Sequence, residues 1–154
     1  METLTVRSPA FEEGQMIPPR FTADGADISP PLEWSKVPPE TASITVIADD
    51  PDAPMGTWVH WVIYNLPPET DALPADVPPV ETLNNGAAQG TTDFGRIGYG
   101  GPAPPSGVHR YFFRVYALDT RLDLPAGATR HEVDRAMRGH ILAQGELMGR
   151  YSRR

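Results

Sequence analysis

The stretch that decides the fold is Thr57-Trp-Val-His-Trp-Val-Ile-Tyr-Asn-Leu66, which is aromatic and β-branched almost throughout. Such residues favour strands, and the lack of a polar alternation is typical of a strand covered on both faces. The stretch is therefore predicted to be a central strand. His60 lies inside it among large apolar residues, where each ring nitrogen needs a partner. A core histidine satisfied by the fold and a ligand-binding histidine both fit this pattern.

Two further segments read as strands on the same grounds. Ser43–Ala48 is short and β-branched, and His109–Leu118 places His109 and Tyr111 on one face and Arg110 on the other. Weaker strand candidates are Leu4–Arg7 and Pro31–Trp34.

One helix is signalled near the end of the chain. Thr129 and Glu132 have the spacing of a capping box, and apolar residues then recur at helical spacing. We expect a helix over 130–142 and a further helical turn near 146–151. Strands followed by a helix predict a mainly β fold with two layers of antiparallel sheet and an appended helix.

Composition supports a single, loop-rich β domain over residues 1–154. The chain has 18 prolines and 14 glycines, which are costly inside helices and exclude a helical bundle. The net charge of −7 disfavours nucleic acid as a partner, and the lack of cysteine excludes disulfides and thiol chemistry. Neither a secretory signal nor a membrane-spanning run is visible, so a cytoplasmic location is expected.

The segment 67–108 lacks clear periodicity and is rich in proline and glycine. Segments of this length inside a compact domain are usually functional or disordered. Because Phe94, Ile97 and Tyr99 punctuate the segment, we expect an ordered, packed loop that contains a short helix or hairpin.

Two clusters contain the residues that could bind a ligand or take part in a reaction. Asp50-Pro-Asp-Ala-Pro54 directly follows a predicted strand, and its prolines make a rigid acidic turn. The stretch 100–108 is a rigid proline- and glycine-rich loop that leads into His109 and Tyr111, and its backbone N–H groups could bind an anion. An acidic turn that only caps its own backbone is the simpler interpretation of the first cluster.

Three kinds of enzyme site fit the sequence poorly. The two aspartates and two histidines of these clusters, which are Asp50, Asp52, His60 and His109, lack the spacing of known metal-ligand motifs, so no metal is expected. Ser106 does not lie in the G-x-S-x-G motif of a nucleophile elbow and reads as a turn residue. No phosphate-binding loop for a nucleotide is present. We therefore expect neither catalysis nor a cofactor.

Together these motifs resemble the phosphatidylethanolamine-binding protein family. The resemblance rests on Asp50-Pro-Asp-Ala-Pro54, Trp58-Val-His-Trp61, the loop Gly101–Gly107 and His109-Arg-Tyr111, in that order and spacing. The ending 139–151 is similar to the bacterial Raf-kinase-inhibitor-like branch, and the similarity extends over about 11–151.

The resemblance implies a β-sandwich of two antiparallel sheets with a C-terminal helix and a small pocket for anionic groups such as phosphate. The family's ligand-binding positions correspond here to Asp50, Asp52, His60, Ala103, His109 and Tyr111, and the pocket wall to Pro54, Pro102 and Pro104. Two positions depart from the bacterial pattern: Ala103 replaces a common cysteine, and Thr92 replaces an asparagine.

The function implied is non-enzymatic binding of a phosphorylated small molecule or a phospholipid headgroup, with a kinase pathway as a possible target of regulation. The alternative is a kinase or protease inhibitor that contacts its target protein through the long loop 67–108. A homodimer is expected by analogy with bacterial relatives.

Overall fold

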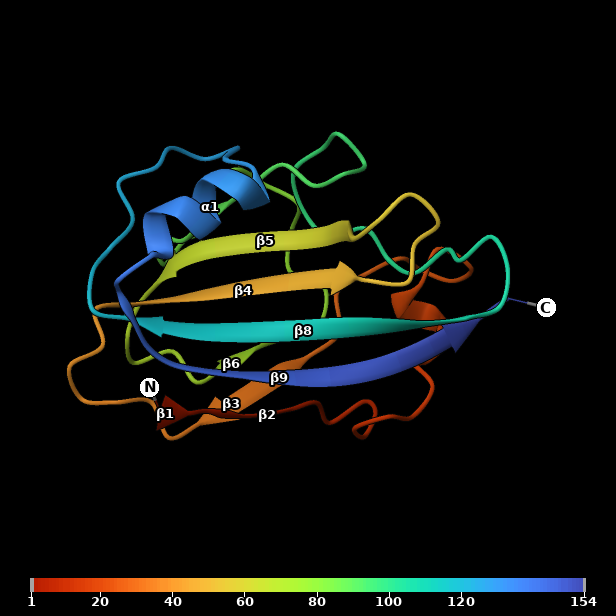
Figure 1. The fold of residues 1–154 in the computed structure, drawn as a ribbon, viewed down its shortest axis with the longest axis horizontal. Helices are drawn as coiled ribbons and strands as arrows, with labels where there is room; N and C mark the ends of the chain where they lie inside the picture. Colours follow the sequence, from red (N-terminus) through yellow and green to blue (C-terminus); the bar gives the residue numbers. More distant parts are fainter. Residues whose placement is uncertain (1, 154) are drawn as a thin grey trace.

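The structure is a computed structural model that describes residues 2–153, and it has two β-sheets and one α-helix (Figure 1). The larger sheet has the strand order β1-β9-β8-β4-β5-β7, and the smaller sheet, β2-β3-β6, lies behind it. Their bounds are β1 Glu2–Thr3, β2 Thr5–Arg7, β3 Leu32–Ser35, β4 Ser43–Asp50, β5 Trp58–Leu66, β6 Ala72–Leu73, β7 Ala88–Gln89, β8 Val108–Leu118 and β9 Ile141–Ser152. A 3-10 turn covers Pro19–Phe21.

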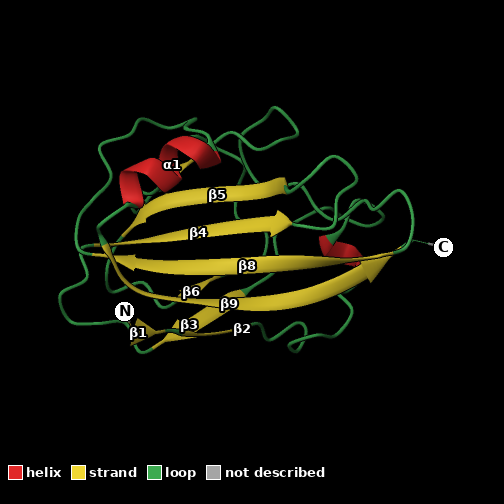
Figure 2. Cartoon of the chain, viewed as in Figure 1, coloured by secondary structure: helices red, strands yellow, loops and turns green. Residues whose placement is uncertain are grey.

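The predicted strands are confirmed, and β5 is buried along nearly its whole length as expected. Neighbouring strands pair antiparallel, except that β1 pairs parallel with β9. An inner core fills the space between the two sheets, with Trp61, Phe113 and Ile44 among its largest side chains. An outer core lies between the larger sheet and helix α1, which spans Arg130–Met137 (Figure 2).

The start of α1 agrees with the sequence, but its end does not. Thr129 and Glu132 form both halves of the capping box, and Val133 and Met137 are buried. The helix ends at Met137 instead of Leu142 because Gly139 adopts a φ of 79°, the left-handed conformation that commonly follows a helix. None of the helices within residues 2–153 is long and apolar enough to cross a membrane.

The expected helical turn near 146–151 is wrong, because these residues belong to β9. This strand pairs with β8 along almost its entire length, from Val108–Ser152 to Leu118–Ile141. Its glycines permit close contacts with the N-terminal segments that run along β9, whose Leu4 and Ile17 N–H groups donate to the carbonyls of Gln144 and Arg150. A Cβ atom on Gly145 would lie 2.1 Å from the Leu4 carbonyl oxygen, and one on Gly149 would lie 2.6 Å from the Ile17 side chain.

The long segment 67–108 is ordered and packed. It contains two short strands, β6 and β7, and, of the two expected alternatives, hairpin-like antiparallel bridges at Thr82–Ala88 and Thr91–Ile97 instead of a helix. The buried Gln89 side chain fastens it: its Oε1 accepts a hydrogen bond from Trp61 Nε1, and its Nε2 donates to the carbonyls of Pro78 and Val80. The proline-rich part of the chain is thus tied to the central strand β5.

We predict that Gly145→Ala lowers the free energy of unfolding by about 1–3 kcal/mol, because the added methyl group must displace the backbone at Leu4. Chemical denaturation measures this change. Gln144→Ala, an exposed neighbour on β9, is the control and should change stability by less than about 0.5 kcal/mol. Equal stability of the two variants would contradict the close contact.

Candidate functional site

The candidate site is a cavity of about 220 Å³ at the end of the larger sheet where β4 ends and β5 and β8 begin, on the right in Figure 1. The cavity brings together five of the six predicted ligand-binding residues and two of the three predicted wall residues. Its lining consists of Asp50, Ala53, Pro54, Trp58, His60, Phe94, Ala103, Pro104, Pro105, His109 and Tyr111.

Asp50 and His109 form a buried pair inside this cavity. Asp50 Oδ2 lies 2.7 Å from His109 Nδ1, and Asp50 Oδ1 accepts a hydrogen bond from the Asp52 backbone N–H at 2.7 Å. An ionised carboxylate only accepts, so Nδ1 of His109 carries its proton. The remaining nitrogen, Nε2, has no hydrogen-bond partner among residues 2–153. In neutral His109, Nε2 is therefore an acceptor; it becomes a donor when the ring is protonated.

His60 is fixed in the same way by the backbone of the opposite loop. Its Nδ1 lies 2.6 Å from the Gly100 carbonyl, which can only accept, while the Gly100 N–H donates to the His60 carbonyl. The ring thus has its proton on Nδ1, and Nε2 is again left without a partner in the described chain. Burial lowers the pKa of His60 below its ordinary value of 6.5, so the neutral ring predominates at neutral pH.

A β-bulge aims the His60 side chain into the cavity. Ala48 pairs with Trp61, and Asp49 pairs with Val59, so His60 is an extra residue in β5. Strand residues normally alternate between faces, but this bulge allows His60 and Trp61 both to face the inner layer. The sequence shows no signal for the bulge, since every residue around it is suited to a buried strand.

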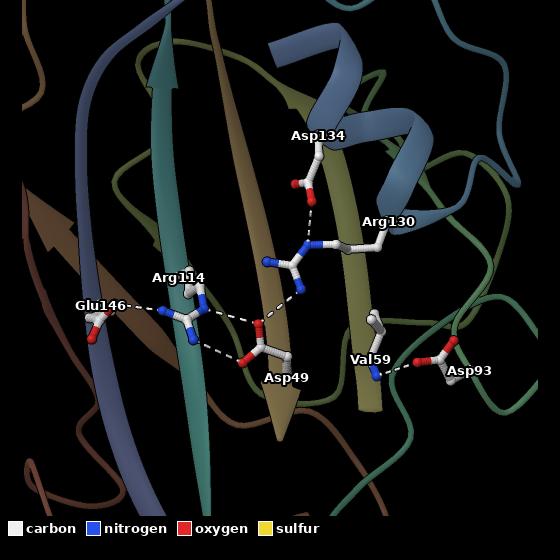
Figure 3. A network of polar contacts seen from close by, with 7 residues as sticks. All are labelled: Asp49, Val59, Asp93, Arg114, Arg130, Asp134 and Glu146. Atoms are coloured by element: carbon white, nitrogen blue, oxygen red, sulfur yellow. Dashed lines mark hydrogen bonds and ion pairs between the residues drawn. The ribbon is translucent and has the colours of Figure 1, made fainter. Parts of the chain in front are cut away.

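Phe94 is a wall residue that the sequence analysis missed, and its neighbour Asp93 fastens this turn to β5. Asp93 Oδ2 accepts from the Val59 N–H at 2.7 Å, as Figure 3 shows, and the Asp93 N–H donates to the Val59 carbonyl. The Phe94 ring lies edge-on to His60 at 5.3 Å and to Trp58 at 5.5 Å. Thr92 replaces the asparagine of the bacterial pattern, and its Oγ1 accepts from the Phe94 N–H, which stabilises this turn.

Tyr111 and Ala103 complete the polar part of the lining. Burial and the nearby Asp50 carboxylate raise the pKa of Tyr111, so its hydroxyl stays protonated and can donate. Ala103 adjoins two prolines that have no N–H, and its own N–H has no acceptor within residues 2–153. The cavity therefore offers two imidazole Nε2 atoms, one phenol and one backbone N–H to a ligand.

Asp52 and Pro102, which were predicted to bind ligand and to form the wall, do not line the cavity. Asp52 instead binds Arg110: its two oxygens accept from the guanidinium at 2.9 Å, and Oδ2 also accepts from the Arg110 backbone N–H. This contact joins the acidic turn to the start of β8. The Pro102 carbonyl accepts from the Ala23 N–H and so fastens the other loop.

The outer face at the same end of the sheet holds a separate ion-pair cluster, which Figure 3 shows. Asp49 is 1% exposed, and its oxygens accept from Arg114 and Arg130 at 2.9–3.1 Å. Arg114 also binds Glu146, and Arg130 Nε lies 2.8 Å from Asp134. Asp49 thus anchors the end of β4 from the side opposite to Asp50.

No group of three or more side chains within residues 2–153 is arranged to hold a metal ion.

The chain was compared with known proteins. The family model described as phosphatidylethanolamine-binding protein matches residues 7–152. A UPF0098 protein of Methanothermobacter thermautotrophicus is 51% identical over 150 residues, which cover 97% of this chain and 99% of that protein. A UPF0098 protein of Aquifex aeolicus is 50% identical over 153 residues, covering 97% and 89%.

Two solved structures are similar over the whole fold. The crystal structure of a putative phosphatidylethanolamine-binding protein homolog, CT736 of Chlamydia trachomatis, matches with a TM-score of 0.91 and 40% identity, covering 100% of both chains. The structure of Escherichia coli YbcL, described as a new member of the mammalian PEBP family, matches with a TM-score of 0.91 and 32% identity, covering 98% of this chain and 99% of that one.

We predict that the contact between Asp52 and Arg110 stabilises the fold above the ordinary pKa of a carboxyl group. Hydrogen bonds from Arg110 lower the pKa of Asp52 from 3.8 to about 2. A depressed carboxyl pKa adds stability that is complete above pH 3.8 and is lost as the pH falls toward 2. The stability difference between the natural protein and Asp52→Asn should therefore be constant above about pH 5 and shrink in acid. A difference that does not change with pH would contradict the contact.

Proposed function

Because the chain belongs to the phosphatidylethanolamine-binding protein family, we propose that its cavity binds the phosphate group of a small molecule or of a phospholipid headgroup without chemical turnover. One observation carries the proposal: the Nε2 atoms of His60 and His109 both lack a protein partner and both belong to residues that line the cavity. When protonated, each Nε2–H can donate a charge-assisted hydrogen bond to a phosphate oxygen. Tyr111 and the Ala103 N–H are the further donors.

The charges around the cavity support an anion as the ligand. Both Asp50 oxygens already accept hydrogen bonds, one of them from the His109 ring. Asp52 is paired with Arg110 outside the cavity. A bound phosphate would therefore face imidazole Nε2 atoms and not carboxylates without partners.

The cavity lining contains no serine, threonine or cysteine that could act as a nucleophile, and the Ser106 hydroxyl belongs to an exposed residue outside it. A role in a kinase pathway, a homodimer and inhibition of a protein target through the loop 67–108 stay predictions from the family resemblance. A cytoplasmic location stays a prediction from the sequence.

We predict that sulfate, a phosphate analogue that remains a dianion between pH 5 and 8, binds more tightly as the pH falls through this range. Protonation of His60 and His109 supplies the donors, and each proton taken up on binding increases the affinity by up to about tenfold per pH unit. Titrations followed by NMR at several pH values measure the change. Because sulfate itself does not titrate here, affinity that is independent of pH would contradict the role of the imidazoles.

We predict that His60→Gln weakens phosphate binding by about tenfold or more, since a hydrogen bond to a charged group contributes about 1.5–3 kcal/mol. Isothermal titration calorimetry measures the affinity. His140→Gln is the matched control, because His140 pairs with Asp119 and does not line the cavity. Equal phosphate affinity of the two variants would place the anion elsewhere. Inhibition of a protein target that survives His60→Gln would instead favour the loop 67–108 as the functional surface.

A further inference from the structure

We propose that the phosphate group recognised by this cavity carries an apolar substituent about the size of one ring, so that the ligand is a phosphomonoester and not free phosphate. This inference rests on the proposed function and specifies the class of ligand. It follows from the division of the cavity into a polar floor and an apolar wall.

The floor is polar and deeply buried. The exposed fractions of Asp50, His60, His109 and Tyr111 are between 2% and 7%. These four residues provide every ionisable side chain of the lining. A phosphate that binds the two Nε2 atoms therefore lies at the bottom of the cavity.

The wall and the mouth are apolar. Trp58 and Phe94 are partly exposed and meet edge to face, and Pro54 and Pro105 are exposed. Ala53, Ala103 and Pro104 supply the rest of the lining and have no polar side-chain atoms. Whatever group is attached to a phosphate on the floor must pass these side chains, and an apolar group would bury its surface and theirs together.

One exposed apolar residue directly follows the lining in sequence. Met55, next to Pro54, is 96% exposed. Two guanidinium groups near the mouth are engaged by carboxylates: Arg110 pairs with Asp52, and Arg96, which lies 4.9 Å from the centroid of the Phe94 ring, pairs with Asp27. The side chains that line the mouth itself are uncharged, which favours an apolar substituent.

The size of the cavity agrees with such a ligand. An apolar protein cavity of about 150 Å³ is large enough to bind benzene. The cavity here is about 220 Å³. A phosphate on the floor leaves room against Trp58 and Phe94 for a substituent that an ion alone would not fill.

The test compares methyl phosphate with phenyl phosphate, which share the phosphomonoester group and differ in the apolar substituent. Calorimetry at one pH should show that phenyl phosphate binds at least about tenfold more tightly, since each additional methylene-sized group in an apolar pocket contributes substantially to affinity. Trp58→Ala should reduce this ratio toward one. Phe112→Ala, which removes an aromatic ring outside the cavity lining, is the control and should keep the full ratio.

The outcomes separate this inference from the proposed function. Equal affinities of the natural protein for methyl and phenyl phosphate would overturn the inference and leave phosphate binding intact. Phenol that binds as tightly as phenyl phosphate would overturn the proposed anion site instead. A Trp58→Ala variant that is folded by circular dichroism and keeps the full ratio would also overturn the inference, because the substituent would not contact this wall.

Discussion

Two adjacent carboxylates at the end of β4 have different partners on opposite faces of the larger sheet. Asp49 faces the outer core, where Arg114 and Arg130 compensate its buried charge. Asp50 faces the inner layer, where it holds the His109 ring. A buried carboxylate is costly unless it is paired, so each of these contacts constrains the backbone at the point where the chain leaves the sheet. The site depends on this constraint, because Asp50 can orient His109 only if the end of β4 is fixed.

The same end of the sheet is held from two further directions. The bulge at His60 is stabilised by Asp93, which occupies both the N–H and the carbonyl of Val59. The acidic turn is joined to β8 by Asp52 and Arg110. Each imidazole is therefore held by its Nδ1 atom, which leaves its Nε2 atom available to a ligand. This preorganisation reduces the entropic cost of binding a small anion, which has few atoms with which to offset that cost.

Much of the fold can be predicted from local sequence, but the elements that were not predicted depend on contacts between residues far apart in the chain. The strands β4, β5 and β8 and the start of α1 are visible as β-branched runs and a capping box. Residues 146–151 were expected to form a helical turn but belong to β9, where the close approach of Leu4 requires glycine at position 145. The sequence alone does not show that Leu4 lies there, since 140 residues separate the two positions.

The candidate site, too, was predicted only in part. Motif resemblance identified Asp50, His60, Ala103, His109 and Tyr111, which the structure brings together. It gave no site role to Phe94 or to Trp58, which was part of a quoted motif, because an aromatic residue fits a core position equally well. It also did not pair Asp52 with Arg110 across 58 residues. The proton positions on the imidazoles also became apparent only from the structure, through the Gly100 carbonyl and the Asp50 carboxylate.

The central claim is that anion binding is coupled to protonation of the two imidazoles, whose Nε2 atoms have no hydrogen-bond partner in residues 2–153. Proton uptake during binding tests it most directly. Calorimetry of sulfate binding at pH 7.5, in buffers with different enthalpies of ionisation, gives the number of protons taken up. We predict a net uptake by the natural protein and a smaller uptake by His60→Gln. Binding of sulfate with no proton uptake in the natural protein would contradict the claim.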